Sequence, residues 1–183
     1  MAEIIDYSFD NIERVAECLR EGKVGILPVD TIYGISSVVS EEGSERIYEI
    51  KERPQNKSFI VLMTKEQVLA SGLIVPDDIL HLWPCSLTAV LPYPDGRTLA
   101  VRVPGDEYLQ RLLPLSGPIY STSVNISGTP SLLSYDEILP VFGGRVDFIV
   151  KNTDVRGGQS STLVDATKKP YRILRQGSYI LSV

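Results

Sequence analysis

Three basic side chains lie within one short, proline-containing segment of the chain. The segment is KERPQNKS, residues 51–58, and its cations are Lys51, Arg53 and Lys57. Clustered cations can bind a phosphate or a carboxylate, because arginine offers a bidentate fork and lysine a point charge. They can also be a solvated helix end, where cations complement the helix dipole. The segment alone leaves both interpretations open.

Two more arginines and a segment rich in hydroxyl groups could complete a site for anions. Arg102 lies in the apolar run AVRVP, so it must form an ion pair or face a cavity. An edge strand or a structural salt bridge would explain it without any function. Arg175 lies near the end of YRILRQG. Residues 121–131, STSVNISGTPS, combine serine, threonine and asparagine, although these residue types also favour an ordinary turn.

The elements that would position these residues alternate in a pattern typical of a mixed α/β sheet in one domain. Residues 10–22 are predicted to be a helix capped by Asp10 and ended by Gly22, and residues 44–54 a helix ended by Pro54. Strands are predicted within residues 23–29, 58–63, 118–124, 145–150, 161–167 and 171–177, and a hairpin within residues 86–104. Capping boxes at Thr64–Gln67 and Ser134–Glu137 predict two further helix starts.

The predicted strands end in the same polar segments that contain the candidate site residues. PVDTIYG follows one buried strand, Arg102 ends another, and residues 121–131 overlap the end of a third. In open α/β sheets, ligands bind in the crevice at the ends of the strands. We therefore expect the basic and polar side chains of these segments to line one cavity. They are Lys51, Arg53, Arg102, Ser123, Asn125 and Arg175.

Composition limits the class of protein. The 183 residues are 43% hydrophobic and 22% charged, as in a soluble globular protein, and the length suits one domain over residues 1–183. The net charge of −5 argues against a general nucleic-acid binder, which usually has a basic excess. No apolar run could span a bilayer, and the N-terminus lacks a signal-peptide pattern, so we expect no membrane association.

Cysteine and histidine are too rare to suggest a metal centre. Cys18 and Cys85 are the only cysteines, and they suggest neither a disulfide framework nor a zinc site. A cytoplasmic location fits such a chain best. His81 is the only histidine, which argues against a histidine-rich metal site and against a Ser-His-Asp triad. We therefore predict no metal site built from protein side chains.

The motifs, taken together, resemble those of one family. Their order and spacing are similar to those of the YrdC-type threonylcarbamoyl-AMP synthases: PVDTIYGI, KERPQNKSFIVLM, WPCSLTAVLP, TLAVRVP, STSVNISGTPS, SSTLVD and ILRQG. The match runs from about residue 10 to the end, and the Lys-x-Arg-Pro-x-x-Lys and Ser-x-Asn blocks are its most specific parts. The resemblance implies a twisted mixed α/β sheet around a deep, cationic cavity, in the single-domain form of the family.

The resemblance also implies an activity, that of an L-threonylcarbamoyladenylate synthase. Such a nucleotidyltransferase converts L-threonine, bicarbonate and ATP into threonylcarbamoyl-AMP and pyrophosphate, and downstream threonylcarbamoyl-transferase proteins then modify an adenosine of certain tRNAs. Magnesium is expected with the triphosphate, held mainly by the nucleotide and water. Fixed cations would suffice, because nucleotidyl transfer relies on positioning and charge stabilisation more than on covalent protein chemistry.

Residue roles follow from the resemblance, position by position. The residues expected to hold L-threonine are Thr31, Arg102, Ser121 and Ser161. The residues expected to contact ATP are Arg53, Lys57, Thr98, Ser123, Ser131 and Arg175. The residues expected to act in catalysis are Lys51, which would stabilise charge near the reacting phosphate, Arg53, and Asn125, which would orient its loop or a phosphate.

The chain departs from the family pattern at several positions. Cys85-Ser86 replaces the usual Gly-Pro, Ser58-Phe59 replaces Pro-Leu, and Ser160 replaces Glu. Leu62 occupies a position where some members have a histidine that touches threonine. We therefore expect looser recognition of the amino acid, although none of these changes removes a cation.

Two other classes of function remain open. A carbamoyl-phosphate-handling enzyme, like the YrdC-like module of hydrogenase maturation proteins, would have a similar cavity, although that module normally belongs to a much longer chain. An RNA-binding or ribosome-assembly factor could use a concave basic surface. The acidic net charge and the lack of a basic run with interleaved aromatics limit that expectation to a weak RNA contact.

Overall fold

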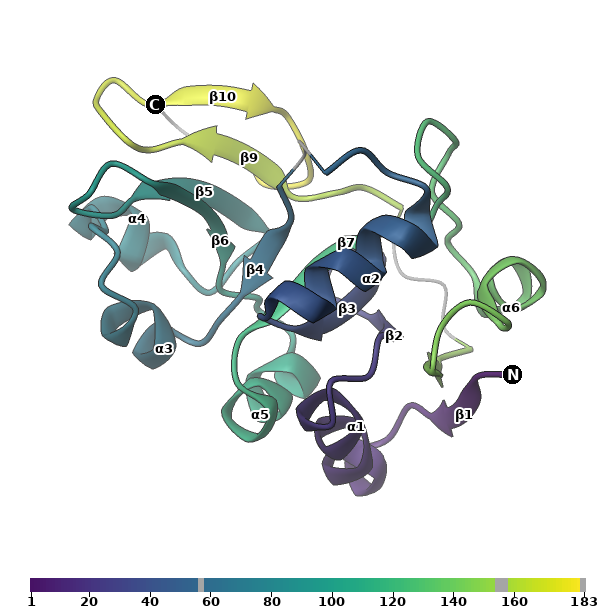
Figure 1. Cartoon of the computed structure of the whole chain (residues 1–183). Helices are drawn as coiled ribbons and strands as arrows, with labels where there is room; N and C mark the ends of the chain where they lie inside the picture. Colours follow the sequence, from purple (N-terminus) through teal and green to yellow (C-terminus); the bar gives the residue numbers. More distant parts are fainter. Residues whose placement is uncertain (56–57, 154–157, 182–183) are drawn as a thin grey trace.

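A single sheet runs across the whole molecule, from β1 at one edge to β10 at the other (Figure 1). The computed structural model describes residues 1–55, 58–153 and 158–181. Within these residues, ten strands lie in the order β1-β8-β2-β3-β7-β4-β6-β5-β9-β10. Their bounds are β1 Glu3–Asp6, β2 Gly25–Pro28, β3 Tyr33–Val38, β4 Ile60–Leu62, β5 Leu87–Pro92, β6 Thr98–Arg102, β7 Ile119–Ser123, β8 Phe148–Lys151, β9 Thr162–Asp165 and β10 Arg172–Arg175.

Parallel and antiparallel neighbours are mixed in this sheet. β8 lies parallel to β1 and β2, β4 lies parallel to β6, and β5 lies parallel to β9. The other neighbours, such as β3 with β7 and β5 with β6, are antiparallel. The predicted α/β fold class with a mixed sheet is therefore confirmed, and so is the predicted hairpin, which forms β5 and β6.

Helices cover both faces of the sheet (Figure 1). Their bounds are η1 Phe9–Asn11, a 3-10 turn, α1 Ile12–Arg20, α2 Glu41–Lys51, α3 Lys65–Ala70, α4 Asp77–Leu82, α5 Glu107–Ser116 and α6 Tyr135–Phe142. On β2, Leu27 packs with the apolar residues of α1 and α5, whereas Ile26 packs with those of α2 and α6. Because consecutive strand residues point to opposite faces, the two helix pairs lie on opposite sides of the sheet.

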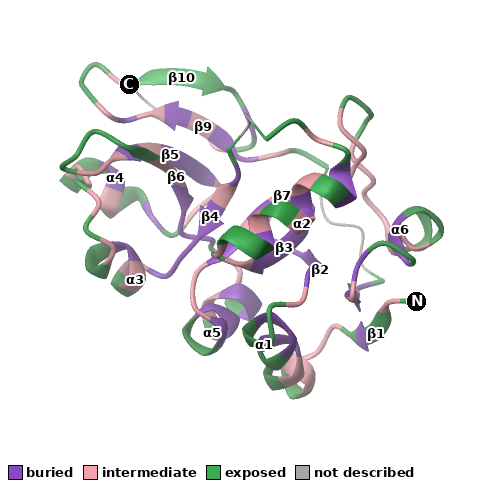
Figure 2. Cartoon of the chain, in the orientation of Figure 1, coloured by how far each residue is buried: buried purple, intermediate pink, exposed green. Residues whose placement is uncertain are grey.

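The buried side chains form three apolar clusters along the sheet, and the helices turn their buried faces toward them (Figure 2). The third cluster joins Val68 of α3 and Ile79 of α4 to the β5–β6 hairpin and Trp83. None of the helices in the described part of the chain is long and apolar enough to cross a membrane. The boundaries of one domain, residues 1–183, stay a prediction.

Two predicted helix starts are confirmed and a third is wrong. Thr64 Oγ1 accepts a hydrogen bond from the Gln67 backbone, and the Gln67 side chain accepts one from the Thr64 backbone. The capping box at the start of α6 is equally complete. Asp10 does not cap α1, because Phe9–Asn11 already forms a 3-10 turn and α1 begins only at Ile12.

The sequence analysis missed two strands. β3 carries Ser36 and Ser37, which are fully buried, so it lacks the apolar run that marks β2. β1 has four residues, and three of them are exposed at the edge of the sheet. Pairing with β8 defines β1, and pairing with β2 and β7 defines β3, whatever the apolarity of their side chains.

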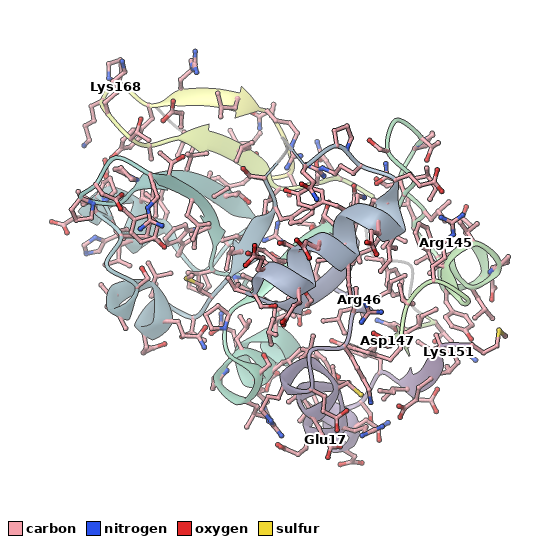
Figure 3. The ribbon with its side chains drawn as sticks, in the orientation of Figure 1. Glu17, Arg46, Arg145, Asp147, Lys151 and Lys168 are labelled. Carbon is pink, nitrogen blue, oxygen red and sulfur yellow. The ribbon has the colours of Figure 1, made fainter. Side chains whose placement is uncertain are left out.

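An ion pair fastens α2, whose end carries the candidate cations, to the segment before β8. Arg46 on α2 donates to both carboxylate oxygens of Asp147, at 2.7 and 3.2 Å (Figure 3). Asp147 also accepts a hydrogen bond from the Val24 backbone at 2.8 Å, next to β2. This single carboxylate therefore ties the middle of α2 to the segments that precede β2 and β8.

Candidate active site

A cavity of about 370 Å³ lies over the central strands of the sheet. Part of its lining is a row of paired residues. Ser121 of β7 lies opposite Ile60 of β4, Ile60 opposite Ala100 of β6, and Ala100 opposite Val90 of β5. The volume falls within the usual range of small-molecule sites, about 300–1,000 Å³.

Seven of the predicted site residues line this cavity, although the chain brings them from widely separated positions. They are Thr31, Arg53, Arg102, Ser121, Ser123, Ser161 and Arg175. Three of them are arginines, and the described lining residues include no acidic side chain. Positive charge and hydroxyl groups around one small space suit anionic ligands.

A buried carboxylate holds Arg102 in place. Its Nη2 donates to Asp30 Oδ1 at 2.8 Å, and the two side chains are only 4% and 9% exposed. Burial raises the pKa of Asp30 above its ordinary value, while the Arg102 charge acts in the opposite direction. Arg102 Nε is buried without a hydrogen-bond partner among the described residues, which is unusual for a buried donor.

Arg102 therefore fulfils both expectations made for it, since it forms an ion pair and also lines a cavity. The alternative that it belongs to an edge strand is wrong. β6 lies between β4 and β5 and pairs with both of them.

Arg53 lies just beyond the end of α2. Glu52 adopts a left-handed conformation, with φ of 51°, and this ends the helix before Arg53. Arg53 donates from Nη1 to Thr122 Oγ1 at 3.2 Å and from Nη2 to the Ser58 carbonyl oxygen at 3.1 Å. Burial lowers the pKa of Arg53, and its Nε lacks a hydrogen-bond partner within the described residues.

Arg175 and Ser161 form another part of the cavity lining. Arg175 Nη2 donates to the Ser161 carbonyl oxygen at 2.9 Å and lies 3.4 Å from Ser161 Oγ. Ser161 Oγ also shares a hydrogen bond of 2.8 Å with the fully buried hydroxyl of Thr88. Burial lowers the pKa of Arg175, and the nearby charge of Arg102 lowers it further. Thr88 and Arg175 together fix the position of the Ser161 hydroxyl.

Lys51 lies behind the cavity rather than in it. Its side chain is 1% exposed, and its ammonium donates to Asn125 Oδ1 at 2.8 Å, to the Asn125 carbonyl oxygen at 3.0 Å and to the Ser123 carbonyl oxygen. Ser123 Oγ donates to the same Asn125 Oδ1 at 2.7 Å. Burial, aided by the charge of Arg53, lowers the pKa of Lys51 to about 8.

A sequence model of the Sua5/YciO/YrdC family, described as "telomere recombination", matches residues 17–177. The chain belongs to this family. The predicted family resemblance is thus confirmed over most of the sequence.

Relatives within the family have similar sequences and structures. A threonylcarbamoyl-AMP synthase of Pyrococcus abyssi is 34% identical over 91% of this chain and 54% of its own length. A threonylcarbamoyl-AMP synthase of Vibrio parahaemolyticus is 27% identical over 92% of this chain and 100% of its own length. The structure of P. abyssi Sua5 complexed with L-threonine has a TM-score of 0.85 and 31% identity, covering 97% of this chain and 57% of that one. The chain thus spans about half of the archaeal relative and all of the bacterial one.

Four of the described residues expected to act in the site are not among the lining residues, and a fifth expected residue is not described. Lys51 and Asn125 form the network behind the cavity, as described above. Thr98, at the exposed start of β6, and Ser131 also lie outside the lining. Lys57 falls outside the described residues. The roles that the family resemblance gives to all five stay predictions.

Two residues that hold the site together escaped the sequence analysis as members of it. Asp30 lies in the segment PVDTIYG and Thr88 in the predicted hairpin, but neither was predicted to belong to the site. A buried arginine in an apolar strand requires an acidic partner, so Arg102 itself was the signal that could have led to Asp30. Thr88 carried no such signal, because its hydrogen bond to Ser161 depends on the parallel pairing of β5 with β9.

Two glycines let the backbone approach the site closely. A Cβ atom on Gly34 would lie 2.6 Å from Ser121 Oγ, within the cavity wall. A Cβ atom on Gly177 would lie 2.2 Å from the Ser160 carbonyl oxygen and 2.4 Å from the Ser161 carbonyl carbon. Any side chain at Gly177 would therefore displace the segment that carries Ser161.

The departures from the family pattern fall in different places. Ser160 lines the cavity, and so do Ser58 and Phe59. Leu62 is fully buried in the apolar cluster of α1 and α5, so it does not line the cavity. The backbone of Cys85 donates to the Val103 carbonyl oxygen at 3.1 Å, and Ser86 Oγ accepts from Ser178 Oγ at 2.9 Å. The altered turn is thus tied to both β6 and the C-terminal segment.

Side chains suited to metal binding are dispersed. Within residues 1–55, 58–153 and 158–181, no three His, Cys, Asp or Glu side chains are grouped so that they could hold a metal ion. A magnesium ion held chiefly by nucleotide oxygens and water would not require such a group. The expectation of nucleotide-bound magnesium stays a prediction.

Proposed function

We propose that this chain is an L-threonylcarbamoyladenylate synthase, a nucleotidyltransferase that makes threonylcarbamoyl-AMP and pyrophosphate from L-threonine, bicarbonate and ATP. The observation that carries the proposal is the convergence of Arg53, Arg102 and Arg175 with serine and threonine hydroxyls on one cavity. The relatives named threonylcarbamoyl-AMP synthase, and the L-threonine complex of a structural relative, support the choice of substrates.

The amino acid would lie at the Arg102 end of the cavity. Arg102 would bind the threonine carboxylate through the donors that Asp30 leaves free. Ser121, Ser161 and Thr31 would hydrogen-bond the remaining polar groups of threonine. Since the positions of Arg102 and Ser161 are each fixed by a buried partner, the amino acid would meet a site that is already ordered.

The triphosphate would lie between Arg53 and Arg175. In the proposed reaction, the threonine nitrogen takes up the carbon of bicarbonate with loss of water, and a carbamate oxygen then attacks the α-phosphorus of ATP while pyrophosphate leaves. Arg53, Arg175 and Ser123 would hold phosphate oxygens and stabilise the charge that develops on the leaving group. Magnesium, bound by the nucleotide, would supply further charge neutralisation.

Lys51 and Asn125 would then act on the loop that bears Ser123. The Lys51 ammonium already binds oxygens of Ser123 and Asn125, so its charge reaches a phosphate only through that loop. We therefore assign both residues the role of positioning Ser123. The proposed setting is cytoplasmic, with downstream threonylcarbamoyl-transferase proteins as receivers of the product and at most a weak contact with RNA.

A direct test is the release of pyrophosphate from ATP by the purified protein, measured with and without L-threonine and with and without bicarbonate. We expect release only when both are present, together with a product that has the mass of threonylcarbamoyl-AMP. Release that ignores threonine, or that requires carbamoyl phosphate instead, would support the carbamoyl-phosphate-handling alternative. Tight RNA binding without any pyrophosphate release would support the RNA-binding alternative.

A further inference from the structure

The three arginines of the cavity do not have equivalent electrostatic surroundings. Arg102 is paired with the buried carboxylate of Asp30 at 2.8 Å. Arg53 and Arg175 have no ion pair with any residue of the described part of the chain. Their donors meet neutral oxygens instead, from Thr122 and Ser58 for Arg53 and from Ser161 for Arg175.

The carboxylate of Asp30 forms its ion pair with Arg102. Its Oδ1 accepts from Arg102, and its Oδ2 is buried without a hydrogen-bond partner among the described residues. Because the pair is almost completely shielded from water, each charge cancels much of the field of the other. Arg102 itself thus adds little net charge to its end of the cavity, whereas Arg53 and Arg175 keep their positive charge uncompensated.

This difference matches two kinds of ligand. A polyanion such as a triphosphate gains most from unpaired cations. A free amino acid is a zwitterion with no net charge, and a strongly positive site would repel its ammonium group. At its own end of the cavity, the Arg102 guanidinium belongs to the lining and can still donate to a carboxylate, while Asp30 reduces the field that would draw phosphate there.

We propose that Asp30 is a specificity-determining residue, which reserves the Arg102 end of the cavity for a zwitterionic amino acid and keeps phosphate groups out of it. This inference rests on the proposed function. It assigns Asp30 an effect beyond holding Arg102, namely the separation of two substrates that both carry anionic groups.

The wild-type protein offers a first test, with inorganic phosphate as the probe. Phosphate should inhibit pyrophosphate release competitively against ATP and not competitively against L-threonine. If phosphate competes with L-threonine in the wild-type protein, then Asp30 does not exclude it and the inference is overturned. This arm does not depend on the folding of any variant.

The second test is Asp30→Asn, which keeps the shape of the side chain and an oxygen for Arg102 but removes the charge. We expect phosphate to become a competitive inhibitor against L-threonine, with affinity at that end raised about tenfold or more by the uncompensated charge. ATP at high concentration should then inhibit as well, because its phosphates can occupy the threonine position. The KM for ATP at saturating threonine should change less than about twofold, since Arg53 and Arg175 are untouched.

A matched control is Asp147→Asn, which weakens the Arg46 ion pair outside the cavity lining (Figure 3). It removes a paired carboxylate from the same sheet, yet it should leave the pattern of phosphate inhibition unchanged. If Asp30→Asn lowers thermal stability and leaves the inhibition pattern like that of Asp147→Asn, Asp30 has only a structural role.

Calorimetric titration separates this inference from the proposed function. Binding of phosphate and of L-threonine to the wild-type protein and to Asp30→Asn can be measured without turnover. A wild-type protein that binds both at once but releases no pyrophosphate would contradict the synthase proposal and leave the Asp30 inference standing. A folded Asp30→Asn protein that still binds threonine and phosphate independently would contradict the inference about Asp30.

Discussion

Lys51 and Arg53 come from the same end of one helix, two positions apart, yet they lie in opposite surroundings. Lys51 ends α2 with its ammonium buried among oxygens of Ser123 and Asn125, whereas Arg53 lines the cavity. The left-handed residue Glu52 between them redirects the chain. The comparison teaches that two cations of one motif can have different roles, since Lys51 holds protein oxygens behind the cavity and Arg53 lines the cavity itself.

The largest effect on stability should come from the buried cation. Lys51→Met would remove the donor from three protein oxygens and leave Asn125 Oδ1 with fewer partners. We expect a loss of about 3 kcal/mol in the free energy of unfolding, because hydrogen bonds from a buried charged group are expensive to lose. Urea unfolding measures it. A stability within about 0.5 kcal/mol of wild type would break the comparison.

Arg53, the cation that lines the cavity, should affect turnover strongly and stability only weakly. Arg53→Ala should reduce turnover on the order of a hundredfold, because a charged contact to a transferring group is worth several kcal/mol. The free energy of unfolding should change by less than about 0.5 kcal/mol. Arg53→Lys should restore only part of the rate, since a point charge cannot replace a bidentate fork.

Pyrophosphate release and a thermal melt on the same samples check the Arg53 prediction. The matched control is Arg145→Ala, which removes an arginine whose partner Glu52 is the residue next to Arg53, outside the cavity. A folded Arg53→Ala protein with wild-type turnover at low ATP would show that the segment 51–58 is only a solvated helix end.

The buried lysine should also make stability depend on pH. Its pKa is about 8 in the folded protein against an ordinary value of 10.5. Between these values the unfolded chain binds more protons than the folded chain, so the free energy of unfolding rises with pH. Relative to Lys51→Met, the wild-type protein should gain about 2 kcal/mol between about pH 7.5 and pH 9.5. Parallel pH profiles of the two proteins would show that Lys51 keeps its ordinary pKa.

The smallest effect should come from Asn125, whose side-chain oxygen accepts a hydrogen bond from Lys51. Asn125→Ala would remove the oxygen shared by Lys51 and Ser123, and also the donors to the Thr129 and Ile126 carbonyls. Water can reach this partly exposed loop, so we expect a loss of only about 1 kcal/mol in stability. Turnover should fall while the KM for L-threonine stays within about twofold, because the threonine wall does not include this loop. A raised KM for threonine alone would contradict this account.

The sequence predicted the fold well where apolar runs and turn residues agree. β2, the β5–β6 hairpin and the capping boxes of α3 and α6 all follow from local patterns. β3 could not be predicted in this way, because the buried polar residues Ser36 and Ser37 interrupt its apolar pattern and its backbone is paired with β2 and β7. Its existence depends on pairing across the sheet, which no local pattern records.

For the candidate site, the sequence predicted which polar residues converge but not how each of them is held. Arg102 could be found because a charge in an apolar strand is unusual, whereas the roles of the serines were implied by the family resemblance. The inward turn of Lys51 could not, since it depends on carbonyl oxygens of a loop more than seventy positions away. Asp30 and Thr88 act through other site residues, since Asp30 binds Arg102 and Thr88 binds Ser161. These contacts can be recognised only once the pairing of the strands is known.

The order of residues around the cavity has a consequence for synthesis on the ribosome. Lining residues begin at Val29 and end at Arg175, on the last strand of the sheet. A nascent chain that emerges at about 5–20 residues per second would present Arg53 on the order of ten seconds before Arg175. Until β9 pairs with β5 and carries β10 into place, the anion site has only one of its two unpaired arginines. A growing chain thus completes its charge cluster only after the rest of the sheet exists.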